Sequence, residues 1–429
     1  MSRPDVAAAA PPRRGTVLLS VGLVANGMGH AFLLIVLPPL GRQLGFGDVQ
    51  TGLLLSLSAL TMTLTAPLWG HLCEAWGRRR LLLIGLAASA LFPAALAVLV
   101  DLRLSLALSS GMTFALLLGL RLPLAAAAGG LNPASQAFMA DVTSADRRAG
   151  GMGLMGAAFG VGAIGGGMLA MALGGDNLIL ALGLIAAVVA GATIVSWWLL
   201  PEPPRPAAAT VDGDARRVPL ARIWPFLGIA LLGITVYSLL QQVTALRLQD
   251  GFGLTPDASI RMAGTMLMAS MVAKIGAQII LVRTLSGPPL RPLIIGVLCT
   301  AAMMLLAALA PSVLVMGVAM AGIGFGMGFM FPGNLAAMSV STGAGAQAKV
   351  AGINGLGVGL GLAAGPLLGA SLHQLSPEMP FFASTGLLVV VLVLAWVGRH
   401  RTRDHEAGRS PDGVGRSSPG RGAATSPLS

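Results

Sequence analysis

Long apolar runs alternate with short charged segments along almost the whole chain. Each run holds about 20 or more mostly apolar residues, the length that a helix needs to cross the hydrocarbon core of a bilayer. Twelve such runs can be counted, and each is expected to form one spanning helix. The predicted spans are 16–39, 49–72, 81–100, 112–138, 150–172, 178–200, 224–246, 259–282, 291–310, 312–337, 350–373 and 380–398. The pattern therefore predicts an all-α integral membrane protein with 12 transmembrane helices.

The composition supports a membrane protein and argues against a soluble one. Of the 429 residues, 55% are hydrophobic and only 10% are charged, whereas soluble proteins carry roughly 25% charged residues. The 59 glycines suit membrane helices, because small residues let helix backbones approach closely. The two cysteines, Cys73 and Cys299, provide no disulfide framework.

The net charge of +11 reflects membrane topology rather than nucleic-acid binding, since the arginines cluster between the apolar spans. Most basic residues fall in alternate connections, which is the positive-inside pattern. This basic side includes Arg3, Arg13, Arg14, Arg78, Arg79, Arg80, Arg147, Arg148, Arg205, Arg216, Arg217, Arg222, Arg283, Lys349, Arg399, Arg401 and Arg403. In the other connections, Arg42, Arg103 and Arg247 are balanced by acids such as Asp48 and Asp250. Both termini are therefore predicted to be cytoplasmic.

The chain is predicted to divide into two six-helix bundles, at 15–200 and 223–400. The stretch 201–222 is rich in proline, alanine and charge, which is typical of a linker and here of a cytoplasmic one. Residues 1–14 and 401–429 are low-complexity tails that we expect to be disordered and cytoplasmic. The first apolar run lacks a cleavage site and is too long for a signal-peptide core, so it is expected to be retained.

An internal repeat supports this division. A shift of 199 residues places the segment 132–170 on 331–369 without a gap. The shift aligns Gly162 with Gly361 and Gly166 with Gly365, and it places spans 4 and 5 on spans 10 and 11. Two related halves around a central pathway are a common transporter architecture.

A charged stretch between the second and third spans carries a resemblance to a known family. It reads G-H-L-C-E-A-W-G-R-R-R, and Gly70, Glu74, Gly77, Arg78 and Arg79 fit the pattern G-x-x-x-[DE]-R-x-G-R-[RK]. The chain thus resembles the major facilitator superfamily, in particular its 12-helix drug and metabolite:proton antiporters. Ala75 stands where that family usually has arginine.

The resemblance implies two pseudo-symmetric six-helix bundles and a gating role for this stretch. Glu74 would face the N-terminal end of span 11, where free backbone N–H groups favour a carboxylate. Arg78 would pair with Asp141 at the end of span 4, and both contacts would close the cytoplasmic side in the outward-facing state. The alternative is that Arg78, Arg79 and Arg80 only determine topology.

A glycine pattern of the family's proton-coupled exporters is also present. Span 5 carries a degraded version, whereas span 11 carries it intact in Gly352, Gly361, Gly365 and Pro366. These residues could serve close helix packing alone, or packing that also controls how the halves move.

Three basic or potentially basic residues lie near the middle of predicted spans: His30, Arg121 and Lys274. Arg121 also matches the arginine of the family's motif in that helix. A charge at this depth costs about 2.5–3.5 kcal/mol on insertion scales, and none of the sixteen acidic residues lies mid-membrane to offset it. An anionic substrate would supply part of the compensation. His30 is the candidate proton-coupling group, because histidine changes charge near neutral pH.

Polar residues within the spans complete the set of candidate substrate-binding residues. They are Asn26, Tyr237, Gln241, Gln242, Asn334 and Asn354. Each could instead make an interhelical hydrogen bond. Methionines could add an adaptable apolar wall, or simply pack; they are Met262, Met266, Met268, Met271, Met320, Met327 and Met330.

These features predict a secondary active transporter that works by alternating access. The favoured function is proton-coupled export of a small carboxylate-bearing metabolite, such as a siderophore or an organic acid, across a bacterial inner membrane. A multidrug/proton antiporter, an importer by symport and a non-transporting membrane receptor remain alternatives. No Walker loop, metal cluster or nucleophile–base arrangement is recognised, so neither an enzyme nor a cofactor is expected. The expected partners are an anionic small molecule, protons and the lipid bilayer, with no nucleic acid, and the chain is expected to be a monomer.

Overall fold

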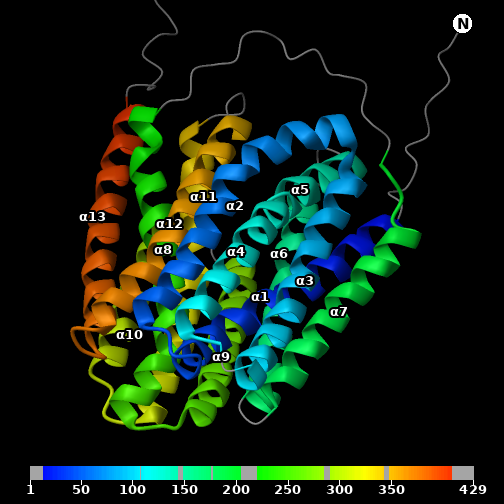
Figure 1. Ribbon diagram of the computed structural model, residues 1–429. Coiled ribbons are helices and arrows are strands. Elements are labelled where there is room, and N and C mark those ends of the chain that lie inside the picture. The colour runs from blue at the N-terminus through cyan, green and yellow to red at the C-terminus, as the bar shows by residue number, and fades with distance from the viewer. Residues whose placement is uncertain are drawn as a thin grey trace, which may run out of the picture.

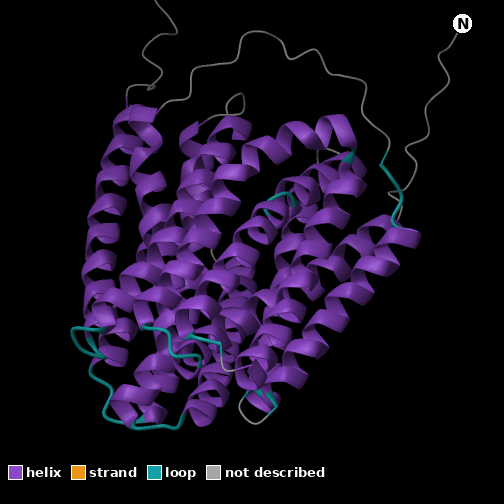
Figure 2. Cartoon of the chain, viewed as in Figure 1, coloured by secondary structure: helices purple, strands orange, loops and turns teal. Residues whose placement is uncertain are grey.

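The computed structural model describes residues 13–106, 108–143, 148–174, 177–203, 220–284, 290–342 and 347–407. Over these residues the chain is helical with short connections and no strand (Figures 1 and 2). The helices are α1 Arg13–Gln43, α2 Asp48–Trp76, α3 Arg78–Leu106, α4 Ser110–Ala128, α5 Leu131–Val142, α6 Arg148–Leu173, α7 Leu178–Leu199, α8 Leu220–Phe252, α9 Pro256–Thr284, α10 Leu290–Ala308, α11 Val313–Thr342, α12 Gln347–His373 and α13 Met379–Ala407.

Among the described residues, twelve segments are long and apolar enough to cross a membrane, which confirms the number predicted from the sequence. The fourth of them, Ser110–Val142, is divided into α4 and α5 by Gly129 and Gly130. Pro133 follows the break, and a proline has no N–H with which to continue the helical hydrogen bonds. Beside the break, Trp69 of α2 donates to the carbonyl of Ala126, with an N···O distance of 2.6 Å.

Several helices extend beyond the predicted spans, because helical geometry continues into the polar segments outside the apolar core. The predicted linker ended at residue 222, but α8 already begins at Leu220. The predicted disordered tail began at residue 401, but α13 continues to Ala407. The stretch Gly70–Arg80 is helical except at Gly77. The structure therefore places these helix ends beyond the predicted bounds.

Gly77 makes the sharp turn between α2 and α3. Its backbone has φ 93° and ψ 157°, a combination that is essentially restricted to glycine. A Cβ at this position would also lie 2.5 Å from the Oε1 of Glu202. The position therefore requires glycine both for its conformation and for the close approach of the segment after α7.

The two halves, α1–α7 and α8–α13, repeat the same packing. In the N-terminal half, a Cβ on Gly162 of α6 would lie 2.9 Å from the backbone nitrogen of Met28. In the C-terminal half, the aligned Gly361 of α12 has the same relation to Thr235 of α8, at 3.1 Å. The glycines of the sequence repeat thus hold equivalent helix pairs together, and the register that matches Met28 with Thr235 also matches His30 with Tyr237.

The bundle has two ends, which we name the linker face and the opposite face. The linker face is where α7 ends and α8 begins; the opposite face carries the short loops 44–47, 253–255 and 374–378 (Figure 2). Tryptophans are found at membrane interfaces because the indole is partly apolar and partly polar. All of them lie toward the linker face: Trp69, Trp76, Trp197, Trp198, Trp224 and Trp396.

The halves are in contact near the opposite face and separate toward the linker face. Near the opposite face, the backbone N–H of Leu367 in α12 donates to Ser56 of α2 at 3.0 Å. Farther along the same helix pair, Thr63 still packs on Gly359. Beyond that point a Cβ on Gly70 or Gly352 would have no neighbour within 4 Å among the described residues. The space between the halves therefore widens toward the linker face.

Candidate functional site

A cleft between the halves brings together three residues predicted to bind substrate: Tyr237, Gln241 and Lys274. It is lined by α1 and α6 of the N-terminal half and by α8, α9 and α11 of the C-terminal half. Gln241 lies one helical turn after Tyr237, and its Nε2 donates to the tyrosine oxygen at 3.0 Å. Lys274 and Ser270 project from α9 into the same cleft. The predicted polar residues of the C-terminal half thus form one cluster.

Lys274 is held by aromatic rings rather than by an acid. Its Nζ lies 5.0 Å from the ring centre of Tyr237 and 5.3 Å from that of Phe331 in α11. Such cation–π contacts stabilise an ammonium group without neutralising it. Within the part of the chain that the structure describes, this ammonium makes no ion pair. The cleft therefore holds a positive charge that a bound anion could balance.

Arg121 and His30 form a second basic region in the N-terminal half. The Nε of Arg121 donates to Ser58 of α2 at 3.1 Å, and its guanidinium lies 4.0 Å above the ring of Phe92. His30 packs on Phe159 of α6 with ring centres 5.8 Å apart, and it is close enough to Arg121 to interact electrostatically. Neither residue lines the cleft that contains Lys274.

The other predicted polar residues lie apart from the cleft. Asn26 is half-buried. Asn334 is buried and donates to the carbonyl of Phe226 at 3.0 Å, while its Oδ1 has no partner. The Oδ1 of Asn354 and both amide atoms of Gln242 are also buried without a partner. Of the predicted methionine wall, Met268, Met271 and Met327 line the cleft.

The predicted partners around the α2–α3 turn are partly in place. The Nε of Arg78 lies 2.7 Å from Asp141, and both side chains are largely buried. Arg79 donates to the carbonyl of Trp197 at the end of α7. Glu74 is exposed, and its predicted contact with α12 is not formed among the described residues, because the halves are apart at this end.

Glu202 is a residue of this region that the sequence did not single out. It follows α7, and its two carboxylate oxygens accept the backbone N–H groups of Arg78 and Arg79 at 2.7 and 3.1 Å. These N–H groups belong to the first turn of α3, where a negative charge is favoured by the helix dipole. Glu202 therefore ties the beginning of the linker to the α2–α3 turn.

The glycines of the predicted exporter motif pack inside the C-terminal half rather than between the halves. Gly361 and Gly365 face the backbone of α8, whereas Gly352 faces open space. The contact across the halves involves the next residue instead, because the carbonyl of Pro366 approaches Gly52 of α2.

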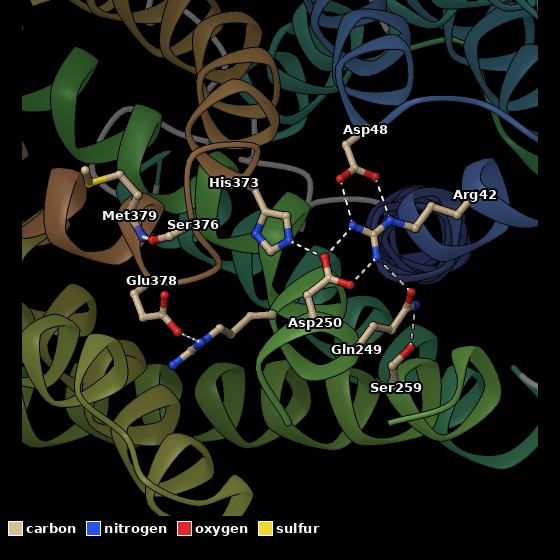
Figure 3. Close-up of polar contacts among 10 residues, drawn as sticks. Arg42, Asp48, Gln249, Asp250, Ser259, His373, Ser376, Glu378 and Met379 are labelled. Carbon is tan, nitrogen blue, oxygen red and sulfur yellow. Dashed lines mark hydrogen bonds and ion pairs between the residues drawn. The ribbon is translucent and has the colours of Figure 1, made fainter. Parts of the chain in front are cut away.

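A charged cluster on the opposite face joins the halves and was not predicted as a site (Figure 3). Arg42 at the end of α1 contacts Asp48 of α2 at 2.7 Å and Asp250 of α8 at 2.6 Å. The Nε2 of His373, at the end of α12, lies 2.8 Å from Asp250. A carboxylate oxygen of Asp48, one of Asp250 and a ring nitrogen of His373 lie within 4.8 Å of one another, a spacing that could hold a metal ion. However, the Arg42 guanidinium already bridges the two carboxylates.

A second ion pair on this face stays within the C-terminal half. Arg247 of α8 contacts Glu378 in the loop after α12 (Figure 3). Burial alone would raise the pKa of Glu378, but its hydrogen bonds and the Arg247 charge hold that pKa below its usual range.

The repeat in the structure, rather than a signal in the sequence, relates the two sides of the inter-half cluster. In the register that matches Met28 with Thr235, Gln43 is matched with Asp250, so Arg42 and Asp250 stand at equivalent ends of α1 and α8. Opposite charges at equivalent helix ends are placed to meet when the halves close on that face.

Twelve spanning helices in two related halves around a central cleft define a multi-pass membrane protein of the transporter class. Comparison with family models identifies the family of transporters. The model described as Major Facilitator Superfamily matches residues 19–356 and 257–427. The chain belongs to the major facilitator superfamily.

Solved structures show the same fold. A bacterial homolog of the human lysosomal transporter Spinster, in an inward-facing and occupied conformation, matches with a TM-score of 0.73 and 14% identity, over 93% of this chain and 98% of that one. The human organic anion transporter MFSD10 (TETRAN) matches with a TM-score of 0.66 and 22% identity, over 90% of this chain and 100% of that one.

Proposed function

We propose that this protein is a secondary transporter that exports a small anionic metabolite across a bacterial inner membrane in exchange for protons. The observation that carries the proposal is Lys274, a cation in the cleft between the halves that has aromatic neighbours but no acidic partner among the described residues. A cation inside a membrane protein is costly and usually marks a substrate or ion pathway.

Alternating access would follow from the way the halves meet. The Arg42–Asp250 ion pair holds the opposite face closed, while the space between the halves widens toward the linker face. With both termini on the cytoplasmic side, as the charge distribution predicts, this arrangement is inward-facing. Rocking of the halves would break the Arg42–Asp250 contact and close the linker face.

Only the Glu74 part of the gating role predicted for the α2–α3 turn fits this cycle, because the Arg78–Asp141 pair is already formed while the linker face is open. Arg78, Asp141 and Glu202 fix the turn within the N-terminal half. Glu74 stands exposed at the end of α2. When the linker face closes, its carboxylate would reach the first turn of α12, where free N–H groups favour an anion.

The anionic substrate class has a counterpart among proteins of this fold. One protein with the same fold is an organic anion transporter, and that likeness at 22% identity concerns the fold. The carboxylate-bearing metabolites named above, siderophores and organic acids, are candidate substrates for the cleft.

The test is transport by purified protein in proteoliposomes. Currents on a solid-supported membrane would be recorded after concentration jumps of a panel of carboxylates and sulfonates. We expect a saturable response to at least one anion, lost by roughly tenfold or more in Lys274→Gln because one charge-assisted contact is removed, and largely kept in Lys274→Arg. Lys349→Gln, which removes an exposed charge at the linker face, is the control. The proposal fails if no anion gives a response that depends on Lys274.

Proton coupling is tested separately. With pyranine inside the vesicles, an anion gradient should move protons in the wild type. His30→Gln should abolish this proton movement while exchange of labelled for unlabelled anion continues. Unchanged proton movement in that variant would exclude His30 as the coupling group.

A further inference from the structure

The cleft around Lys274 has two chemically different walls. The polar side chains that line it all come from α8 and α9 of the C-terminal half, namely Tyr237, Gln241, Ser270 and Lys274. The N-terminal half contributes Ala31 and Ile35 from α1, with Ala163 and Gly167 from α6. None of these four side chains can form a hydrogen bond. A ligand in the cleft would meet hydrogen-bonding groups on one side only.

The cleft also offers one cation rather than several. Lys274 is the charged residue among the described residues that line it. Arg121, the other basic group near mid-membrane, is already engaged by Ser58 and Phe92 outside the cleft. A second carboxylate on the ligand would lose its water without gaining a partner, and an unpaired charge is costly to bury.

The remaining lining is apolar and adaptable. Leu240, Leu267 and the flexible side chains of Met268, Met271 and Met327 surround the polar cluster. Methionine fits irregular apolar ligands because its side chain is unbranched and polarizable. This surface favours a hydrocarbon or aromatic body over a hydroxyl-rich one.

From this arrangement we propose that the transported anion is an amphiphile: a single carboxylate, sulfonate or phosphate group on an apolar body. The anionic group binds to Lys274, Gln241 and Tyr237 in the C-terminal half. The apolar body lies against α1 and α6 of the N-terminal half. The ligand enters from water at the linker face, toward which the halves separate. The inference rests on the proposed function and narrows its substrate class.

The two walls also decide how the ligand moves. All directional contacts belong to the C-terminal half, so the anionic group stays with α8 and α9 when the halves rock. The apolar wall of α1 and α6 slides past the ligand without breaking a hydrogen bond. Release toward the opposite face then requires α1, the helix that carries Arg42, to move away from the cleft.

A series of alkanesulfonates tests the proposal, because sulfonates remain singly charged and do not cross a bilayer as neutral acids. Transport currents of the full-length protein would be measured for methane-, butane-, hexane- and octanesulfonate, with citrate as the polyanion. Each methylene that is fully buried should tighten binding about fourfold. We therefore expect the half-saturating concentration to fall by about fifteenfold from butane- to hexanesulfonate, and citrate to give little current.

Three variants test the polar wall and the apolar lining of the cleft separately. Lys274→Gln should remove the response to the whole series, whereas Lys274→Arg should keep it. Met271→Ala should reduce the gain in apparent affinity with chain length at least twofold, because it removes part of the apolar lining. Citrate currents equal to those of hexanesulfonate, or no gain with chain length, would overturn the amphiphile while leaving anion transport in place. Absence of any current that depends on Lys274 would instead remove the proposed function itself.

Discussion

Arg42 and Asp250, which are 208 residues apart in sequence, form a two-pronged ion pair between the halves on the opposite face. The Nη1 and Nη2 atoms of Arg42 lie 2.8 and 2.6 Å from the two carboxylate oxygens of Asp250. The same guanidinium also forms an ion pair with Asp48, and the Nε2 of His373 contacts the carboxylate of Asp250 (Figure 3). This geometry makes the pair one of the contacts that rocking of the halves must break, together with the Leu367–Ser56 hydrogen bond.

Asp250→Asn should therefore shift the protein toward the state that is open at the opposite face. The side chains are partly exposed, so the pair contributes about 1 kcal/mol, which corresponds to roughly a fivefold change in population. Spin labels on Gln43 and Gln374, both exposed on this face, would report the change by pulsed electron spin resonance. We expect the population with the longer distance to grow.

Glu378→Gln is the matched control, since the Arg247–Glu378 pair lies on the same face but within one half. It should leave the distance distribution between the labels unchanged. An equal shift in both variants, or none in Asp250→Asn, would show that the Arg42–Asp250 pair does not hold the halves together.

Gly77 and Gly70 offer a pair of substitutions with opposite expectations. Gly77→Ala forces a side chain into positive φ and against Glu202, which should cost about 2 kcal/mol or more of stability. Gly70→Ala meets open space in a helix and should be neutral or stabilising by up to about 1 kcal/mol. Thermal unfolding in detergent would measure both.

Transport by Gly70→Ala distinguishes an effect on gating from an effect on stability. If α2 and α12 approach each other when the linker face closes, Gly70→Ala should slow turnover while the protein stays as stable as the wild type. Unchanged turnover in Gly70→Ala would mean that the helices do not come close at this position.

Hydropathy was sufficient to predict the spans, because the bilayer imposes a minimum apolar length on each helix. It also made Lys274 and Tyr237 conspicuous, since polar groups stand out in apolar runs. The Arg42–Asp250 pair was not predictable in the same way, because charges at helix ends are common and their pairing depends on how the halves dock. Glu202 escaped notice for a similar reason: it acts on a turn that is 123 residues away.

Acid should weaken the Arg247–Glu378 contact. The pKa of Glu378 is lowered in the folded protein, so its contribution to stability is present above the unfolded pKa of about 4.3 and is lost as the pH falls through the folded value. The carboxylate is 35% exposed, which limits the contribution to less than about 1 kcal/mol.

Thermal unfolding of Glu378→Gln and the wild type across pH 7 to pH 4 tests this contribution. The variant should be slightly less stable at neutral pH, and the difference should shrink toward the acid end. A difference that grows on acidification would have the wrong sign for a lowered pKa.

Gln242 and its neighbour Gln241 provide the last prediction. Both amide atoms of Gln242 are buried without a partner among the described residues, and the residue is 1% exposed. An unsatisfied buried polar group costs about 1–3 kcal/mol, so Gln242→Leu should raise the thermal stability and leave the half-saturating substrate concentration unchanged. Gln241→Leu removes a group that lines the cleft and contacts Tyr237, and it should weaken substrate binding several-fold. If Gln242→Leu instead weakened binding while the protein stayed stable, its amide would have to reach the substrate in another state of the transport cycle.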